Sequence, residues 1–170
     1  MNHDFHRWLA ASNPEPNQAE NEWQDHGLAL LRLGRFEVVR IPDAIVHAAM
    51  GSAEDAVVDF ALTWAVEGAV IHDSRGRNHY ALVAPGTKDR WRIRAGVECL
   101  GPGTHLGVPG PSLVRATPHR PIYWAALPAS GSYFCRTAVV QLLVRVGAAR
   151  LAEAAEVPPP APAKEAASHG

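Results

Sequence analysis

The chain has few cysteines and no long apolar run, and each shortage excludes a class of protein. Its two cysteines, Cys99 and Cys135, stand far apart without a CxxC spacing, which indicates two free thiols in a reducing compartment. No run of about 18 apolar residues occurs, so we expect no membrane span. The N-terminal residues lack the apolar core of a secretory signal, and we therefore expect a cytoplasmic protein.

Glycine motifs that bind nucleotides are also missing. The stretch GPGTHLGVPG, residues 101–110, has neither the GKS or GKT ending of a P-loop nor the GxGxxG spacing that opens a dinucleotide-binding helix. We interpret its glycines and prolines as strand and turn geometry.

Positive charge is carried almost entirely by arginine and is unevenly distributed. The formal net charge is -1, which argues against a protein that coats nucleic acid. Residues 1–70 hold four basic and eleven acidic side chains, whereas residues 71–150 hold eleven basic and three acidic ones. A GC-rich genome explains the preference for arginine over lysine but not this segregation. Because guanidinium groups bind phosphate and carboxylate bidentately, the second half of the chain is expected to attract anions.

Apolar spacing predicts an α+β fold, with a mixed or antiparallel sheet, flanking helices and a long C-terminal helix. The predicted helices cover residues 5–12, 14–26, 42–50 and part of 52–67. The predicted strands cover residues 28–33, 35–41, 69–72, 79–84, 97–101, 104–110 and 121–127. We expect the first two strands to form a hairpin around Gly34, and the next two to form another.

The strongest helix signal spans residues 132–155. Its predicted apolar face consists of Ala138, Leu142, Leu143, Val146, Ala149 and Leu151. Three consecutive prolines follow soon after. We therefore predict one domain over residues 1–155 and a disordered Pro/Ala-rich tail over residues 156–170.

The second predicted hairpin brings two histidines together. If Ser74–Arg77 form the loop, His72 faces His79 across the strands. With the arginines of the loop, this arrangement fits an anion site, a metal site or only a polar hairpin tip. For a metal, the third ligand would come from Glu98, Cys99 or His105. Since no spacing here is diagnostic of a metal site, we predict neither a metal nor a cofactor.

A short basic stretch, KDRWRIR, follows this hairpin. Its cations are Lys88, Arg90, Arg92 and Arg94. They alternate with other residues, so several of them share one face if the stretch is extended. Trp91 then offers a surface on which a nucleic-acid base can stack. The alternative is a solvated surface around a buried tryptophan.

Three blocks of sequence carry a resemblance to a known family. They read HGLALLRLGRFEVVRI (residues 26–41), SRGRNHYALVAPGT (74–87) and GVECLGPGTHLGVPGPS (96–112). In this order they resemble the N-terminal domain of bifunctional DNA primase/polymerases, the prim-pol domain of the archaeo-eukaryotic primase superfamily. The chain looks most like the small, diverged versions found in actinobacteria, and the resemblance spans roughly residues 8–127.

The resemblance implies a fold more strongly than an activity. Active members hold divalent metal with two acids on the strand after GLAL, contact nucleotide phosphates with a histidine, and carry a third acid before a Gly-rich turn. The histidine corresponds to His79 and the third acid to Glu98. Where the acid pair is expected, this sequence has Arg40 and Pro42. A cation in the metal position repels Mg²⁺, so the two-metal phosphoryl-transfer chemistry is not expected.

We therefore expect a non-catalytic prim-pol-like protein with a regulatory or accessory role in DNA replication or in a mobile element. Its expected partners are DNA or a nucleotide, bound weakly, and a further protein. The candidate phosphate-binding residues are Arg75, Arg77, His79, Lys88, Arg90, Arg92 and Arg94.

Two alternatives remain open at this point. One is an active metal-dependent DNA primase/polymerase. It would hold Mg²⁺ or Mn²⁺ with Glu98 and Asp73, assisted by Glu37 or Asp43. The other is a small protein-interaction module unrelated to DNA.

Overall fold

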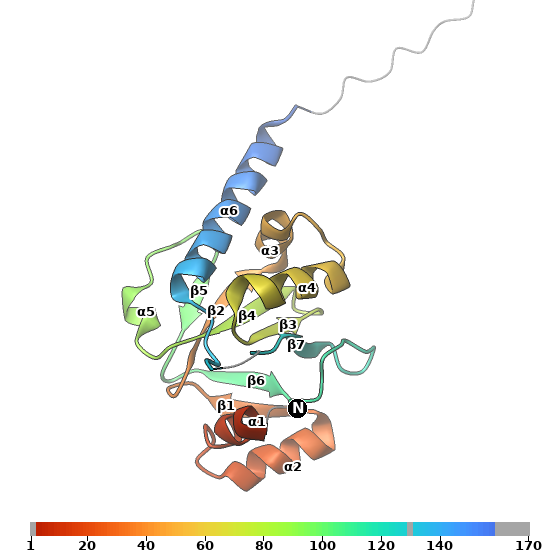
Figure 1. The fold of residues 1–170 in the computed structure, drawn as a ribbon, viewed down its shortest axis with the longest axis vertical. Coiled ribbons are helices and arrows are strands. Elements are labelled where there is room, and N and C mark those ends of the chain that lie inside the picture. Colours follow the sequence, from red (N-terminus) through yellow and green to blue (C-terminus); the bar gives the residue numbers. More distant parts are fainter. Residues whose placement is uncertain (1–2, 129–130, 159–170) are drawn as a thin grey trace, which may run out of the picture.

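The computed structural model describes residues 3–128 and 131–158. Its helices are α1 (His3–Ala10), α2 (Pro16–His26), α3 (Asp43–Met50), α4 (Asp55–Val66), α5 (Thr87–Arg90) and α6 (Thr137–Glu156). Its strands are β1 (Leu28–Arg32), β2 (Glu37–Pro42), β3 (Val70–Asp73), β4 (Asn78–Val83), β5 (Glu98–Leu100), β6 (His105–Pro109) and β7 (Ile122–Ala126). The predicted α+β class, with antiparallel sheets, flanking helices and a long C-terminal helix, is confirmed (Figure 1).

The main sheet has five strands in the order β5-β2-β4-β3-β7, and all of its neighbouring strands are antiparallel. Strands β2 and β3 both flank β4, so they run parallel to each other and are connected through α3 and α4. Strands β4 and β5 both flank β2 and are connected through α5. The four strands thus form two interleaved β-α-β units, a split β-α-β arrangement. Strand β7 extends the sheet beside β3.

The prediction of a hairpin between the first two strands is wrong. Both strands exist, but β1 pairs with β6 in a separate two-stranded sheet, whereas β2 lies between β4 and β5. Strand β2 is buried on both of its faces, through Val38 on one and Val39 and Ile41 on the other. A strand buried in this way occupies the centre of a sheet, where it needs two partners.

The five-stranded sheet separates two apolar cores. On one face, Val39 and Ile41 pack with Leu62 of α4 and Val144 of α6. On the other face lie α1, α2 and the β1–β6 sheet (Figure 1). Because side chains alternate along a strand, those of β3 and β4 are divided between the two cores. The candidate site lies on the face of the sheet toward α3.

The predicted apolar face of the C-terminal helix needs correction. The buried residues of α6 are Val140, Leu143, Val144 and Gly147, whereas Leu142 is 61% exposed. The reason is Gly147, where a Cβ atom would clash with the carbonyl oxygen of Ile45 in α3. The helices approach most closely at the residue that contributes no side chain, so the apolar spacing alone misplaces the face.

The ends of the chain and the cysteines complete the description. Helix α6 ends at Glu156, so the first residue of the predicted tail is helical, and residues 159–170 lie outside the described part. Cys99 and Cys135 are free, as predicted. Both are buried, and burial raises the pKa of each thiol to about 12. Within the described residues, no helix is both long and apolar enough to cross a membrane.

Candidate functional site

His72 of β3 and His79 of β4 face each other, as the sequence predicts. Their rings stack with centroids 3.9 Å apart and an interplanar angle of 8°. Each of these residues is only 1% exposed. The pair therefore lies in the interior, and the buried His79 is not at the hairpin tip where the phosphate-contact hypothesis placed it.

Asp43, the first residue of α3, joins the two histidines. Its Oδ2 lies 3.1 Å from His72 Nε2 and its Oδ1 lies 2.9 Å from His79 Nδ1. The Asp43 backbone N–H donates to the Arg77 carbonyl at 3.0 Å, which fixes the start of α3 against the hairpin loop. These three side chains, Asp43, His72 and His79, are called the Asp43 cluster below. The predicted third ligands Glu98, Cys99 and His105 are not part of it.

The cluster is electrically asymmetric. Burial favours a neutral imidazole, but the hydrogen bond and the charge of Asp43 outweigh burial and raise the pKa of His72. For His79, burial dominates and lowers the pKa. Burial opposes ionisation of Asp43 as well, yet both histidines hold the pKa of its carboxyl well below the usual range. The two histidines of the cluster therefore differ: the protonated form is favoured at His72 and the neutral form at His79, beside a carboxylate.

A hydrogen-bonded chain leads outward from His72. The Tyr123 hydroxyl of β7 donates to Asp59 Oδ2 at 2.9 Å, and the Tyr123 hydroxyl oxygen lies 3.1 Å from His72 Nδ1. Burial and the nearby Asp59 raise the pKa of Tyr123, so the hydroxyl stays protonated. Its oxygen therefore accepts from His72 Nδ1–H. Both ring nitrogens of His72 then act as donors, which agrees with its raised pKa.

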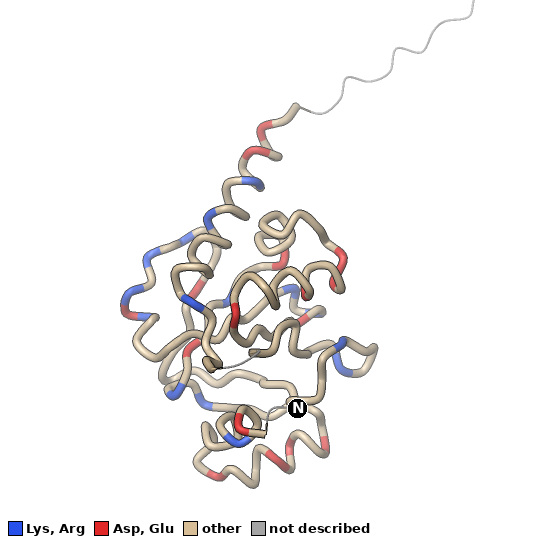
Figure 2. The backbone as a smooth tube through the Cα atoms, viewed as in Figure 1, with Lys and Arg blue, Asp and Glu red and all other residues tan. Residues whose placement is uncertain are grey.

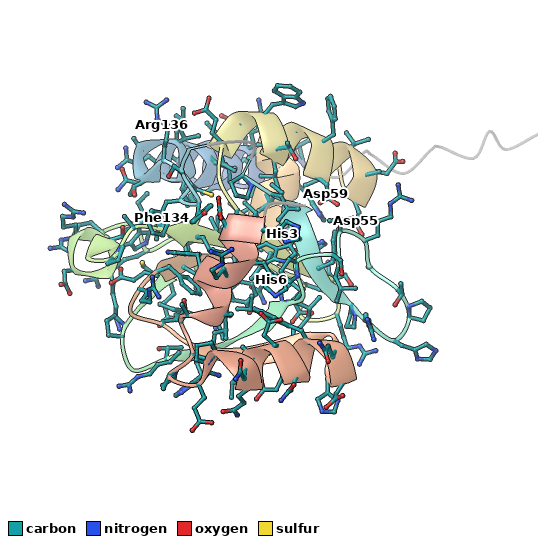
Figure 3. The ribbon with its side chains drawn as sticks, turned by 60° about the horizontal axis from the view of Figure 1, so that its bottom comes forward. His3, His6, Asp55, Asp59, Phe134 and Arg136 are labelled. Carbon is teal, nitrogen blue, oxygen red and sulfur yellow. The ribbon has the colours of Figure 1, made fainter. Side chains whose placement is uncertain are left out.

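This chain ends at a surface cavity of about 610 Å³. Asp55 and Asp59, one turn apart on α4, line it together with Tyr123 and Arg115. Figure 3 shows the two aspartates on the side of α4 toward β7. Burial raises the pKa of Asp59 to about 6. The interior cluster is thus connected to solvent through Tyr123 and Asp59.

Buried polar atoms without a hydrogen bond gather at this site. Within the described residues they are Asp43 Oδ1, His47 Nε2, Asp59 Oδ1, His79 Nδ1 and His79 Nε2. The 2.9 Å contact between His79 Nδ1 and Asp43 Oδ1 is an electrostatic contact, because the ring nitrogen and the oxygen are not aligned for a hydrogen bond. Buried polar atoms normally have partners, so this concentration marks the site as unusual.

The carboxylates required by the active-enzyme alternative do not meet. Asp73 Oδ1 accepts the N–H groups of Arg75 and Gly76, at 3.1 and 2.8 Å, and so closes its own hairpin loop. Glu98 pairs with Arg40 at 2.8 Å. Strands β2 and β4 lie between the strands that carry Asp73 and Glu98, which places these two strands about 14 Å apart across the sheet. They cannot share a metal pair.

Glu37 is also occupied elsewhere. It is buried, and its carboxylate accepts the backbone N–H groups of Gly86 at 2.9 Å and Lys88 at 2.6 Å. Glu37 therefore fixes the turn before α5. Of the four acids considered from the sequence, only Asp43 lies beside His79.

The candidate cationic residues form two separate groups. Arg75 and Arg77 are exposed in the β3–β4 loop, before β4 begins. The other group follows β4 and comprises Lys88, Arg90, Arg92 and Arg94, all exposed. Figure 2 shows blue positions, with the red of Asp89 among them, through α5 and the segment after it. Since β4 separates the groups, the structure does not combine them into one site.

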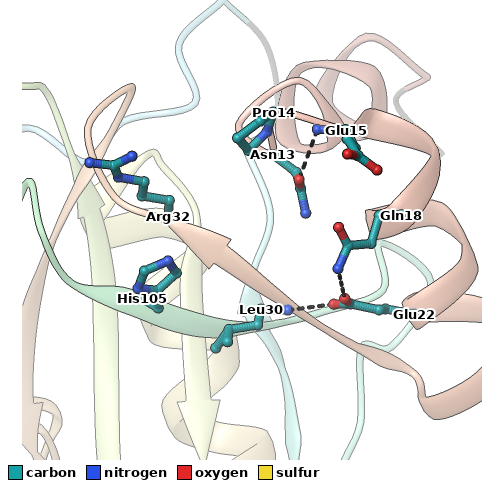
Figure 4. A pocket seen from close by; sticks show the side chains of 8 residues that line it. All are labelled: Asn13, Pro14, Glu15, Gln18, Glu22, Leu30, Arg32 and His105. Atoms are coloured by element: carbon teal, nitrogen blue, oxygen red, sulfur yellow. Dashed lines mark hydrogen bonds between the residues drawn. The ribbon is translucent and has the colours of Figure 1, made fainter.

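A further hollow of about 390 Å³ lies beside α2 and β1 (Figure 4). Its polar groups mostly satisfy one another: Glu22 accepts from Gln18 Nε2 and from the Leu30 N–H, each at 2.9 Å. His105, one of the predicted ligands, lines this hollow rather than the Asp43 cluster. The hollow lacks the buried unpaired groups that distinguish the cluster.

The sequence analysis missed Asp59, Tyr123 and the central role of Asp43. One usable signal was the spacing of Asp43 and His47, which places both on one face of a short helix. No local pattern shows that this helix covers the two histidines. Comparisons with family models, curated proteins and solved structures found no match to the chain.

Proposed function

We propose that the protein is a non-catalytic, prim-pol-like module that binds nucleic acid through its basic segment, residues 88–94, in an accessory role in DNA replication or in a mobile element. One observation carries the binding proposal. Lys88, Arg90, Arg92 and Arg94 are all exposed, and none of them has a carboxylate partner within the described part of the chain. Cations left unpaired on one segment favour phosphate binding.

The burial pattern of the segment supports this proposal. Exposed Arg90, Arg92 and Arg94 alternate with Trp91 and Ile93, which pack against the apolar core. The Trp91 indole N–H also donates to the Ile93 carbonyl at 2.9 Å. Trp91 therefore anchors the segment and leaves the three arginines exposed, although Arg92 Nη1 also donates to the backbone carbonyls of Asp89 at 2.7 Å and Trp91 at 3.0 Å. This arrangement suits contact with consecutive phosphates more than stacking on bases.

The dispersed acids support the absence of catalysis. Two-metal phosphoryl transfer needs carboxylates around a metal pair whose ions lie about 4 Å apart. Asp73 is engaged by its own loop, Glu98 by Arg40 and Glu37 by the turn before α5. A prim-pol-like fold with these acids separated retains a nucleic-acid surface without the means to join nucleotides.

The test is binding of single-stranded DNA, measured by fluorescence anisotropy at several salt concentrations. The triple variant Arg90→Ala/Arg92→Ala/Arg94→Ala should weaken binding at low salt about tenfold or more. It should also lower the slope of log Kd against log salt by about 2, since each lost phosphate contact removes about 0.7. A matched control replaces three exposed arginines on other elements, Arg7, Arg32 and Arg145, and should change Kd less than threefold.

Three results would contradict this proposal. The first is absence of binding by the unaltered protein at low salt, and the second is an equal loss of binding in both triple variants. The third is template-directed nucleotide incorporation with Mg²⁺ or Mn²⁺ that disappears in Asp43→Asn.

A further inference from the structure

We propose that the Asp43 cluster binds one divalent transition-metal ion of the zinc type, with two imidazoles and one carboxylate as ligands. One donor atom from each of Asp43, His72 and His79 can be chosen so that all three lie within 4.8 Å of one another. All three side chains are buried. This site lies apart from the basic segment, and the proposal does not depend on nucleic-acid binding.

The donor spacing fits such an ion. Zinc binds imidazole nitrogen and carboxylate oxygen at about 2.0–2.2 Å, so neighbouring donors of a tetrahedral site lie about 3.3 Å apart. The two contacts of the Asp43 carboxylate with the imidazoles measure 2.9 and 3.1 Å. Shifts of a few tenths of an ångström would open these contacts to the distances of a metal site, and the two stacked rings would also have to tilt so that both nitrogen lone pairs point to one ion.

A second observation points independently to a ligand. His79 is 1% exposed, yet neither of its ring nitrogens has a hydrogen bond, and Asp43 Oδ1 beside it is unpaired as well. An ion between the nitrogen and the oxygen would satisfy both groups. His47 Nε2 is also buried without a partner, and its ring lies 6.3 Å from that of His79. His47 is therefore a side-chain candidate for a fourth ligand.

The donor set defines the class of ion. Two imidazoles and a carboxylate suit Zn²⁺, Co²⁺, Fe²⁺ and Mn²⁺, whereas Mg²⁺ prefers an octahedron of oxygens and Cu⁺ prefers sulfur. The surroundings also fit. With Nε2 on the metal, His72 would keep its Nδ1–H bond to Tyr123, which in turn donates to Asp59. Such outer hydrogen bonds orient metal-binding histidines and fix their tautomer.

The competing explanation is a metal-free pair between the Asp43 carboxylate and a protonated His72. Metal titration separates the two, because binding at His72 Nε2 must displace its proton. The tag-free chain is treated with EDTA, dialysed and titrated with Zn²⁺ or Co²⁺. We expect one equivalent to bind, protons to be released, and Tm to rise by about 5–10 °C when free Zn²⁺ is about a hundredfold above Kd.

Variants locate the binding. Asp43→Asn and His79→Gln should each lose the stoichiometric Zn²⁺ and the Tm shift. His105→Gln, at an exposed histidine on β6 outside the cluster, should keep both. If either cluster variant fails to fold, X-ray absorption of the zinc-loaded unaltered protein replaces it and should show at least two imidazole nitrogens and an oxygen near 2.0–2.2 Å.

Three results would overturn the inference. The first is that the unaltered chain binds no stoichiometric metal. The second is that His105→Gln loses as much bound zinc and Tm shift as Asp43→Asn does. The third is an absorption spectrum that shows sulfur or only water around zinc.

Discussion

At the scale of single residues, Asp43 connects the parts of the candidate site. Its backbone N–H holds the β3–β4 loop through Arg77, and its carboxylate contacts both histidines. From the sequence, an acid after Pro42 is adequately explained as a favourable charge in the first turn of a helix. The structure adds a second role, because the hydrogen bond and the negative charge of the same residue raise the pKa of His72 against the effect of burial.

Asp59 provides a prediction on pH. Burial raises the pKa of Asp59 to about 6 from the model-compound value of 3.8, so the folded protein holds this proton more tightly than the unfolded chain does. Its contribution to stability is therefore fully present below pH 3.8 and is lost as the pH rises through about 6. Asp59→Asn removes this titration while keeping an acceptor for Tyr123.

We expect the unfolding free energy of Asp59→Asn, relative to that of the unaltered protein, to be higher at pH 7 than at pH 4. This relative free energy should differ between the two pH values by about 1–2 kcal/mol, after allowance for solvent screening of this partly exposed group. Urea denaturation at the two pH values measures it. An identical difference in unfolding free energy at both pH values would show that Asp59 titrates normally.

At the scale of elements, the sequence indicated the strands more reliably than their pairing. Alternating or continuous apolar residues located both β1 and β2, because periodicity is a local property. The partner of each strand depends on contacts across the chain: β1 pairs with β6, whose residues lie more than seventy positions later. The second hairpin was predicted correctly because its loop is short, which fixed the register of His72 and His79.

The contact between α3 and α6 yields a prediction on packing. Gly147→Ala adds one carbon where the Ile45 carbonyl oxygen leaves no space, so the helices must separate. We expect a loss of about 2–3 kcal/mol in unfolding free energy, despite the better helix propensity of alanine. Ala149→Met, at an exposed position of the same helix, is the control and should change stability by less than about 0.5 kcal/mol. An unchanged unfolding free energy in Gly147→Ala would mean that α6 packs less closely against α3 than described.

At the scale of the whole molecule, β4 separates two chemical environments. His79, the second residue of β4, belongs to the buried cluster, whereas Lys88 and the exposed arginines follow the far end of the strand. The cluster lies in the interior, and the basic segment lies on the surface. The charge segregation read from the sequence indicated the basic surface. The cluster could not be predicted in full, because Asp43 and the histidines meet only after α3 has folded over the sheet.

This separation leads to a prediction on metal removal. About 13 Å of extended strand lies between His79 and Val83, and the basic segment begins beyond that point. An ion at the Asp43 cluster would therefore stabilise the fold without contacting bound DNA. Chelation at constant ionic strength should lower Tm by about 5–10 °C at the zinc excess given above, yet change the Kd for single-stranded DNA less than twofold at 20 °C.

The Arg90→Ala/Arg92→Ala/Arg94→Ala variant should show the reverse, with weakened DNA binding and an unchanged response of Tm to zinc. Loss of DNA binding on chelation, without unfolding, would mean that metal and DNA share one site. The metal-dependent enzyme alternative would then regain support, because metal ions clamp nucleotide phosphates in that chemistry. If chelation changes only Tm and the arginine substitutions change only the Kd for DNA, the metal has a structural role within a DNA-binding accessory domain. The reason is that an ion that only stabilises the fold acts equally on free and DNA-bound protein.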